Sequence, residues 1–217
     1  MIIESIEGGY DKNFTYLIGC KKSRIGAVID AAVGAEQILK TADELDLVLE
    51  YLVITHSHHD HYASAEPLMR KLDNMTLVMY GDAVKNIGEA NRVQVQDKDT
   101  FHVGSIEVQV LHTPGHYPDS ISLVADGAAF TGDTLFVNRT GRTISPKSDT
   151  RQLYQSVKNK LLNLPENITI YPGHNYGDKP NATLGELKET NQFLQARNAN
   201  HFVEIMDAYE RNRTPGS

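Results

Sequence analysis

The chain combines two hydrophobic periods, one typical of strands and one typical of helices. Runs that are continuously apolar, or that alternate apolar and polar residues, indicate β-strands. Ile106, Val108 and Val110, for example, share one face of such a run. The runs at 14–20 and 24–30 flank a turn-like Lys-Lys-Ser and predict a hairpin. In all, this pattern predicts strands at 14–20, 24–30, 51–55, 76–80, 105–113, 120–126, 128–133 and 168–174.

Apolar residues spaced three and four positions apart indicate amphipathic helices. Ile38, Ala42 and Leu45 share one face of the segment 31–46 in this way. Pro67 is compatible with a further helix because it falls near the first turn of that helix. The same spacing predicts helices over 31–46, 64–72, 82–88, 150–164, 183–195 and 201–212.

The order of these elements indicates an α/β fold. Strands come first, strands and helices then alternate, and the order is repeated in the second half. Two β-sheets packed face to face, with helices on their outer faces, satisfy this order. The 217 residues suffice for a full core and fit one domain over 1–217 better than two.

Composition and charge narrow the classes of function. Apolar residues make up 40% and charged residues 23% of the chain, which is ordinary for a globular protein. The net charge is −7 and no basic stripe is present, so we expect neither a nucleic-acid nor a membrane partner. The N-terminal residues are acidic where a secretion signal would be basic. The single cysteine, Cys20, cannot form an internal disulfide, so we expect a cytoplasmic protein with an inert, buried thiol.

Histidines are concentrated directly after the predicted strand 51–55. The stretch 55–61 reads THSHHDH and holds four of the nine histidines of the chain. His56 and His58 are two residues apart on an extended segment, so both imidazoles can reach one metal ion. Asp60 and His61 follow where the chain turns toward a helix, and that turn lets them face a second point nearby.

Three further candidates end later strands, each beside a glycine. They are His116, Asp133 and His174. Glycine lets the backbone bend sharply and approach closely, and strand ends meet at one edge of a packed sheet. These residues can therefore join the histidine cluster. For the remaining histidines, His59, His102, His112 and His201, we expect ordinary side chains that bind no metal.

The candidate residues have the chemistry of a two-metal site. Imidazole and carboxylate are the zinc ligands that remain when cysteine is absent. A hydrolytic two-metal site needs about six or seven such ligands, with the ions ~3.5–4 Å apart. We therefore predict two bound divalent metal ions, Zn²⁺ by preference and Fe²⁺ as the alternative. The predicted ligands are His56, His58, Asp60, His61, His116, Asp133 and His174.

In these motifs the chain resembles the metallo-β-lactamase superfamily. The signature HxHxDH reads HSHHDH here, and TPGH, TGDTLF, YPGHNYG and the early AVIDAA match further motifs of the family. Within the superfamily the chain looks like the glyoxalase II branch and the neighbouring persulfide dioxygenases. The stretches that carry this resemblance are GRT at 141–143 and the segment 183–195. The resemblance implies a four-layer αβ/βα sandwich, the metallo-β-lactamase fold.

The resemblance also implies which residues share a metal. His56, His58 and His116 would hold one ion, Asp60, His61 and His174 the other, and Asp133 would bridge the two. Asp30 in AVIDAA is expected to support the ligands from behind, because ligating histidines need a partner for their second nitrogen.

We expect a metal-dependent hydrolase, a glyoxalase II-like thioesterase that uses metal-bound hydroxide, with Asp60 as the catalytic residue that orients the nucleophile. The substrate would be a small molecule, such as a glutathione or other thiol conjugate. One alternative is a mononuclear iron persulfide dioxygenase with His56, His116 and Asp133 as its iron ligands. Another is a non-catalytic metal-binding module. A flavin-linked di-iron oxidase fits less well. The motif of that branch resembles HxExDH, and His58 stands in the place of its glutamate.

Two stretches depart from the relatives. Ile144 stands where aspartate usually follows GRT or GRS, and Tyr117-Pro118-Asp119 replaces a Thr-Pro-Gly-like stretch after TPGH. Both departures are expected near the substrate, so they concern specificity rather than metal binding.

Overall fold

The computed structural model describes residues 1–83 and 91–213. The elements are β1 (Ile2–Gly8), β2 (Asn13–Gly19), β3 (Ile25–Ile29), α1 (Ala35–Glu44), β4 (Val48–Val53), α2 (His59–Tyr62), α3 (Ala65–Lys71), β5 (Thr76–Tyr80), β6 (Arg92–Val95), β7 (Thr100–Val103), β8 (Ile106–His112), β9 (Ile121–Ala125), β10 (Ala128–Gly132), α4 (Thr150–Asn159), η1 (Leu161–Asn163), β11 (Thr169–Pro172), β12 (Ala182–Thr183), α5 (Leu184–Thr190), η2 (Gln192–Gln195) and α6 (Ala199–Asn212).

The strands form two six-stranded sheets. The first has the order β1-β2-β3-β4-β5-β6 and the second the order β12-β11-β10-β9-β8-β7. In the first sheet β1, β2 and β3 pair antiparallel, whereas β3 to β6 run parallel. In the second sheet only β10 and β11 pair in parallel. Both sheets are therefore mixed.

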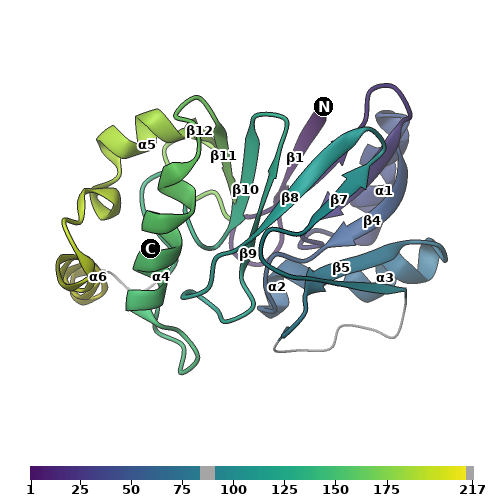
Figure 1. The fold of residues 1–217 in the computed structure, drawn as a ribbon. Helices are drawn as coiled ribbons and strands as arrows, with labels where there is room; N and C mark the ends of the chain where they lie inside the picture. The colour runs from purple at the N-terminus through teal and green to yellow at the C-terminus, as the bar shows by residue number, and fades with distance from the viewer. Residues whose placement is uncertain (84–90, 214–217) are drawn as a thin grey trace.

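Three buried clusters separate four layers. The first, which includes Ile38 of α1 and Leu68 of α3, lies between these helices and the first sheet. The second, which includes Ile18 and Phe130, lies between the two sheets. The third, which includes Phe202 of α6, lies between the second sheet and helices α4 to α6. Figure 1 shows α1 and α3 on one outer side and α4, α5 and α6 on the other. The four-layer sandwich is confirmed.

Most predicted elements are present, with shifted ends. The hairpin of β2 and β3 is confirmed, and β5 has the predicted bounds. The strand predicted at 51–55 runs from Val48 to Val53, so Thr55 already belongs to the loop that carries the histidines. The helix predicted over 31–46 spans only Ala35–Glu44, and the helix predicted over 82–88 falls largely outside the described residues.

Two predicted helices are interrupted. The helix predicted over 150–164 ends at Asn159 and continues as the separate 3₁₀ turn η1. The helix predicted over 183–195 is broken at Asn191, which has extended backbone angles. The buried Asn191 side chain donates hydrogen bonds to the carbonyls of Phe136 and Val137, each 3.2 Å long. A long-range contact thus outweighs local helix propensity at this position.

No helix among the described residues is long and apolar enough to cross a membrane.

Candidate metal centre

Four loops at strand ends bring the candidate ligands together. The residues from Thr55 to His61 follow β4, and His116 lies in the loop between β8 and β9. Asp133 follows β10, and His174 follows β11. Because β10 and β11 are parallel neighbours, Asp133 and His174 leave the second sheet at the same edge. The hydrogen bond from Ile121 N to Thr55 O, 2.8 Å long, ties that sheet to the loop after β4.

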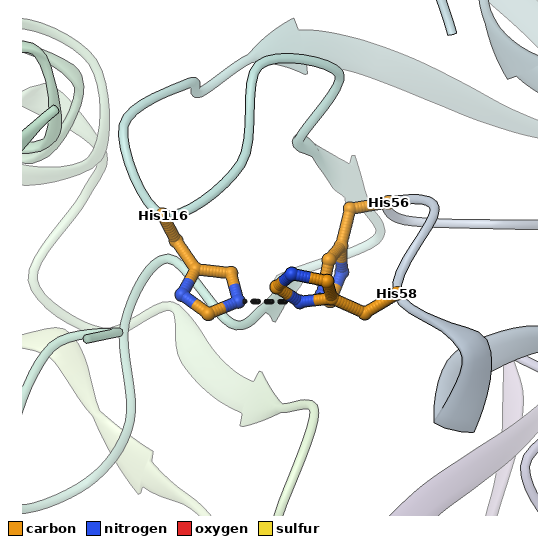
Figure 2. Close-up of side chains that lie close together, drawn as sticks. All are labelled: His56, His58 and His116. Atoms are coloured by element: carbon orange, nitrogen blue, oxygen red, sulfur yellow. Dashed lines mark hydrogen bonds between the residues drawn. The ribbon is translucent and has the colours of Figure 1, made fainter. Parts of the chain in front are cut away.

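One triad consists of His56, His58 and His116. The Nδ1 atom of His58 lies 3.0 Å from His56 Nε2 and 2.9 Å from His116 Nε2. Figure 2 shows the three rings turned toward one another, with His56 and His58 on one loop and His116 on another. Three imidazole nitrogens that converge this closely suit a common metal ion, because neutral imidazole is a ligand for such ions.

A second triad consists of Asp60, His61 and His174. The Nε2 atoms of His61 and His174 lie 3.2 Å apart. Asp60 Oδ2 lies 3.6 Å from His61 Nε2 and 3.5 Å from His174 Nε2. These three atoms also converge on one point. The short helix α2 carries both Asp60 and His61 and so holds them in a fixed relation.

Asp133 lies between the two triads. Its Oδ2 atom is 3.5 Å from His116 Nε2 and 3.3 Å from His174 Nε2, and its Oδ1 atom is 3.4 Å from His61 Nε2. The Oδ1 atom is buried and has no hydrogen-bond partner among the described residues. A buried carboxylate oxygen without a partner is costly, and a metal ion at this position would satisfy it.

The spacing of the donor atoms fits metal coordination. Ligands at about 2.0–2.1 Å from a tetrahedral zinc ion lie about 3.3 Å from one another. The distances within the first triad and around Asp133 are 2.9–3.5 Å. All seven residues predicted from the sequence thus lie at one site, and their geometry is compatible with two ions.

The second nitrogens of His116 and His174 are held by backbone carbonyls of other parts of the chain. His116 Nδ1 donates to the carbonyl of Arg142 over 2.7 Å, and His174 Nδ1 donates to the carbonyl of Asp11 over 2.8 Å. A proton fixed on Nδ1 leaves Nε2 free to bind a metal ion. The backbone therefore sets both the tautomer and the orientation of these rings.

Asp30 supports two more ligands from behind. It is 2% exposed and accepts 2.7 Å hydrogen bonds from Thr55 N, Thr55 Oγ1 and His61 Nδ1. Because the Thr55 hydroxyl donates to Asp30, its oxygen is available to His56 Nδ1, 3.2 Å away. Asp30 thus lies behind the ligands, as expected from the sequence. It contacts His61 directly and His56 through the Thr55 hydroxyl.

Burial and neighbouring charges give the two halves of the site different electrostatics. Burial lowers the pKa of His56 well below its ordinary value, and burial together with His116 lowers the pKa of His58 to about 4. These imidazoles are therefore neutral at pH 7. Burial would also lower the pKa of His61, but nearby carboxylates, Asp133 first, raise it well above its ordinary value. The carboxylate-rich half attracts a cation, as a metal site requires.

The site opens into a cavity of about 820 Å³, within the range of small-molecule sites. Asp60 lines this cavity, and its Oδ2 atom accepts a 2.9 Å hydrogen bond from the buried Asn13. Tyr176 also lines the cavity and stacks on His174, with ring centroids 4.6 Å apart. The sequence pattern did not single out Asn13 or Tyr176. Asn13 starts β2 and looks like an ordinary strand residue, whereas Tyr176 belongs to the quoted NYG stretch.

The histidines expected to bind no metal belong to none of the candidate metal groups among the described residues, although His59 lines the same cavity as Asp60. His59 is exposed and packs edge-on against Tyr62, with ring centroids 5.3 Å apart. His102 is exposed as well. His112 stacks on Tyr80, and its Nε2 atom lies 2.8 Å from the carbonyl of Pro118. His201 lies in α6 and belongs to none of the candidate metal groups.

The two departures from the family pattern have different surroundings. Tyr117 is buried, and its ring lies 4.2 Å from that of His58. Ile144, in contrast, is exposed and lines the cavity. Tyr117 therefore covers a candidate ligand, whereas Ile144 is open to an incoming molecule.

Comparison with protein families agrees with this geometry. The family model described as Metallo-beta-lactamase superfamily matches residues 9–174, most of the chain. The chain belongs to the metallo-beta-lactamase superfamily. The matched region extends from the turn before β2 to His174 and includes all seven candidate ligands.

Within the superfamily the chain is similar to proteins with different names. A probable hydroxyacylglutathione hydrolase of Schizosaccharomyces pombe is 36% identical over 176 residues, which cover 77% of this chain and 66% of the relative. The mitochondrial persulfide dioxygenase ETHE1 of Bos taurus is 32% identical over 197 residues, which cover 89% of this chain and 76% of the relative. The crystal structure of ETHE1 from Myxococcus xanthus superposes with a TM-score of 0.85 and 34% identity, covering 99% of this chain and 93% of that one. Both branches named from the sequence are therefore represented among the relatives.

Proposed function

We propose that this protein is a metal-dependent hydrolase that cleaves a small thioester at a site for two divalent ions. The observation that carries the proposal is the position of Asp133 between two complete triads, with oxygens facing both. Hydrolytic two-metal sites use shared ligands of this kind. With a single ion, the donor atoms of the second triad would bind no metal.

The donor set favours zinc. One ion would be held by His56, His58 and His116, and the other by Asp60, His61 and His174, with Asp133 shared. Imidazole and carboxylate without cysteine is a ligand set of catalytic zinc sites. Such ions, when bound, lower the pKa of a coordinated water and polarise a carbonyl group.

Asp60 is the residue we propose to orient the attacking water. Both Asp60 and Asp133 line the cavity, but the Asp60 side chain is 27% exposed and that of Asp133 only 10%. Burial would raise the pKa of Asp60, but His61 and the hydrogen bond from Asn13 lower it, so the carboxylate is ionised at neutral pH and can accept a hydrogen bond from a water molecule. The bond from Asn13 fixes the orientation of that carboxylate.

The thioester substrate is supported by the name of a relative. The Schizosaccharomyces pombe protein is described as a probable hydroxyacylglutathione hydrolase, and a hydroxyacylglutathione is a thioester. The cavity of about 820 Å³ accommodates a molecule of that size. We therefore propose a small thiol conjugate as the substrate.

A second candidate, an iron-dependent persulfide dioxygenase, is favoured by the likeness to the bovine enzyme and to the Myxococcus xanthus structure. Its iron would be held by His56, His116 and Asp133, two imidazoles and one carboxylate. In this function His58 would not be a ligand, so the two candidates differ in what they require of His58.

Purified protein should therefore be assayed with a thioester and with glutathione persulfide in parallel. Thiol release is followed in the first assay and oxygen consumption in the second. For the hydrolase we expect thiol release that a chelator abolishes and zinc restores. Replacing His58 with alanine should lower kcat by ~100-fold or more, because it removes a direct ligand. The matched control is His102→Ala, which removes an exposed imidazole on β7 that does not line the cavity and should retain activity.

Iron-dependent oxygen uptake with persulfide, combined with absent thioester turnover, would contradict the hydrolase and favour the dioxygenase. Equal loss of activity in the His58 and His102 variants would contradict the assignment of His58 as a ligand.

A further inference from the structure

Two strongly exposed apolar side chains border the cavity of the metal centre. Among the described residues, the exposed large hydrophobic side chains are Tyr10, Val48, Val93 and Ile144. Tyr10 is 93% exposed and Ile144 is 63% exposed, and both line the cavity. Single exposed apolar residues are ordinary. Two of them at one opening, on loops from different sheets, indicate a contact surface for an apolar group.

The backbone next to Tyr10 is fixed to the metal centre. Tyr10 lies in the turn between β1 and β2, and its neighbour Asp11 accepts a hydrogen bond from His174 Nδ1. Asp11 N also donates to Asn13 Oδ1, and the hydroxyl of Tyr176 donates to Asp11 Oδ2. The exposure of Tyr10 is therefore imposed by an anchored turn.

The backbone next to Ile144 is fixed in the same way from the other sheet. Ile144 lies between β10 and α4, and the carbonyl of Arg142 accepts the hydrogen bond from His116 Nδ1. Ser148 Oγ donates to the carbonyl of His116 over 2.8 Å, and Thr143 Oγ1 lies 2.6 Å from Thr150 Oγ1. Anchored backbone on both sides of Ile144 keeps this side chain in solvent.

Further apolar residues line the same cavity as Tyr10 and Ile144. Pro146 follows Ile144 and lines the cavity, as do Ala32, Ala63 and Phe136. An apolar chain that enters between Tyr10 and Ile144 would thus meet further carbon surface inside.

Three arginines line the cavity, Arg139, Arg142 and Arg213, and each already interacts with another part of the chain. Arg142 forms a two-pronged ion pair with Glu210 of α6, with distances of 2.8 and 2.7 Å. Arg139 is only 7% exposed, its guanidinium carbon lies 4.1 Å from the centroid of the Tyr176 ring, and it donates to the Tyr209 hydroxyl. Recognition of an anionic group by Arg139 or Arg142 would have to displace existing partners. The cavity therefore favours an apolar group over an additional carboxylate.

We propose, given the thioesterase function above, that the physiological substrate carries an extended apolar acyl chain, which lies between Tyr10 and Ile144 while the thioester carbonyl is at the metal centre. The thiol part then needs no charged group for recognition.

Thioesters of N-acetylcysteamine, an uncharged thiol, with straight acyl chains of two to eight carbons test this proposal. A fully buried methylene contributes about fourfold in affinity, so about twofold is expected for a half-buried one. Over six added methylenes, kcat/KM should rise by about 60-fold. A kcat/KM that stays constant or falls with chain length, among thioesters that are cleaved, would overturn the proposal.

A matched pair of variants ties the effect to the cavity. Ile144→Asp should lower the ratio of kcat/KM for the octanoyl over the acetyl thioester by about fivefold or more, because a charge replaces part of the apolar contact. Val48→Asp makes the same kind of change at a residue that is 62% exposed on β4 and does not line the cavity, and it should keep the wild-type ratio. Equal ratios in the two variants would refute the role of Ile144.

Binding separates this proposal from the proposed function. If no thioester is cleaved, the thioesterase function fails, and the apolar surface is then tested with S-alkyl-N-acetylcysteamine thioethers, which cannot be hydrolysed. Calorimetry on the metal-loaded protein should show tighter binding from methyl to octyl, weakened in Ile144→Asp. Binding that does not depend on alkyl length would overturn the inference by itself.

Discussion

Replacing Asp30 with asparagine tests how the metal centre is supported. The buried carboxylate accepts three hydrogen bonds of 2.7 Å, two from Thr55 and one from His61 Nδ1. Asparagine has nearly the same shape, but its NH₂ group donates where the carboxylate accepts. At least one of these donors then faces another donor in a buried position.

The size of the effect follows from those bonds. Each hydrogen bond to a charged group contributes about 1.5–3 kcal/mol. An asparagine oxygen in the place of Oδ2 keeps the bonds from Thr55 Oγ1 and His61 Nδ1 at about half their strength, because the charge is lost, and the bond from Thr55 N is lost. We therefore expect Asp30→Asn to lower the free energy of unfolding of the metal-free protein by about 3–5 kcal/mol at pH 7. An uncharged acceptor also holds the proton of His61 on Nδ1 less firmly, so we expect metal affinity to fall about 10- to 100-fold.

Two measurements check this prediction. Urea unfolding of chelator-treated protein, followed by circular dichroism because the chain has no tryptophan, gives the free energy of unfolding. Competition with a chromophoric chelator gives the metal affinity.

Asp149→Asn is the matched control. Asp149 caps α4 by accepting hydrogen bonds from Arg151 N and Gln152 N, a role that asparagine fills about as well, so we expect a change within about 0.5 kcal/mol. If Asp30→Asn changed stability by less than about 1 kcal/mol and bound metal as tightly as the wild type, the supporting role of Asp30 would be wrong.

Three further perturbations test other parts of the structure. Gly173→Ala would place a Cβ atom against Asp133 Oδ1 and 2.9 Å from His61 Cε1, so we expect loss of bound metal, measured by elemental analysis, although no ligand is removed. Full metal content would contradict this close approach. Asp133→Ala should cost more bound metal than replacement of any single ligand histidine, because a shared carboxylate serves both ions; two retained equivalents would exclude the bridge. Asp97→Asn should lower the free energy of unfolding by about 1 kcal/mol at pH 7, since Asp97 accepts a 2.6 Å hydrogen bond from Lys160 and is partly screened by solvent. Burial would raise the pKa of Asp97 but Lys160 lowers it below the ordinary value, so the difference between wild type and variant should persist above about pH 4 and disappear as pH falls through the lowered pKa; a pH-independent difference would contradict the ion pair.

The sequence predicted the layers because its hydrophobic periods are strong in the interior elements. The buried strands β2 and β5 are continuous apolar runs, whereas β1 was not predicted. Its central residues Glu4 and Ser5 are exposed, and it joins the sheet through β2 alone. The short strands β6 and β7, four residues each, also lie at sheet edges and carry too few apolar positions to be recognised.

The site was predicted where chemistry follows from residue type and spacing. HSHHDH and the histidines and aspartate at later strand ends converge as expected, and their role as metal ligands stays a prediction. Contacts between distant segments could not be predicted from local pattern. Asn13 reaches Asp60 across 47 positions, and Arg142 reaches Glu210 across 68. Only the packing of the layers creates such pairs.

The central claim is a site for two metal ions in a hydrolase, and anomalous scattering from crystals of protein prepared without chelator tests it most directly. Data collected across the zinc and iron absorption edges should show two zinc peaks about 3.5–4 Å apart, one at each triad, with Asp133 between them. A single peak at the iron edge beside His56, His116 and Asp133, with nothing bound at Asp60 and His61, would contradict the account.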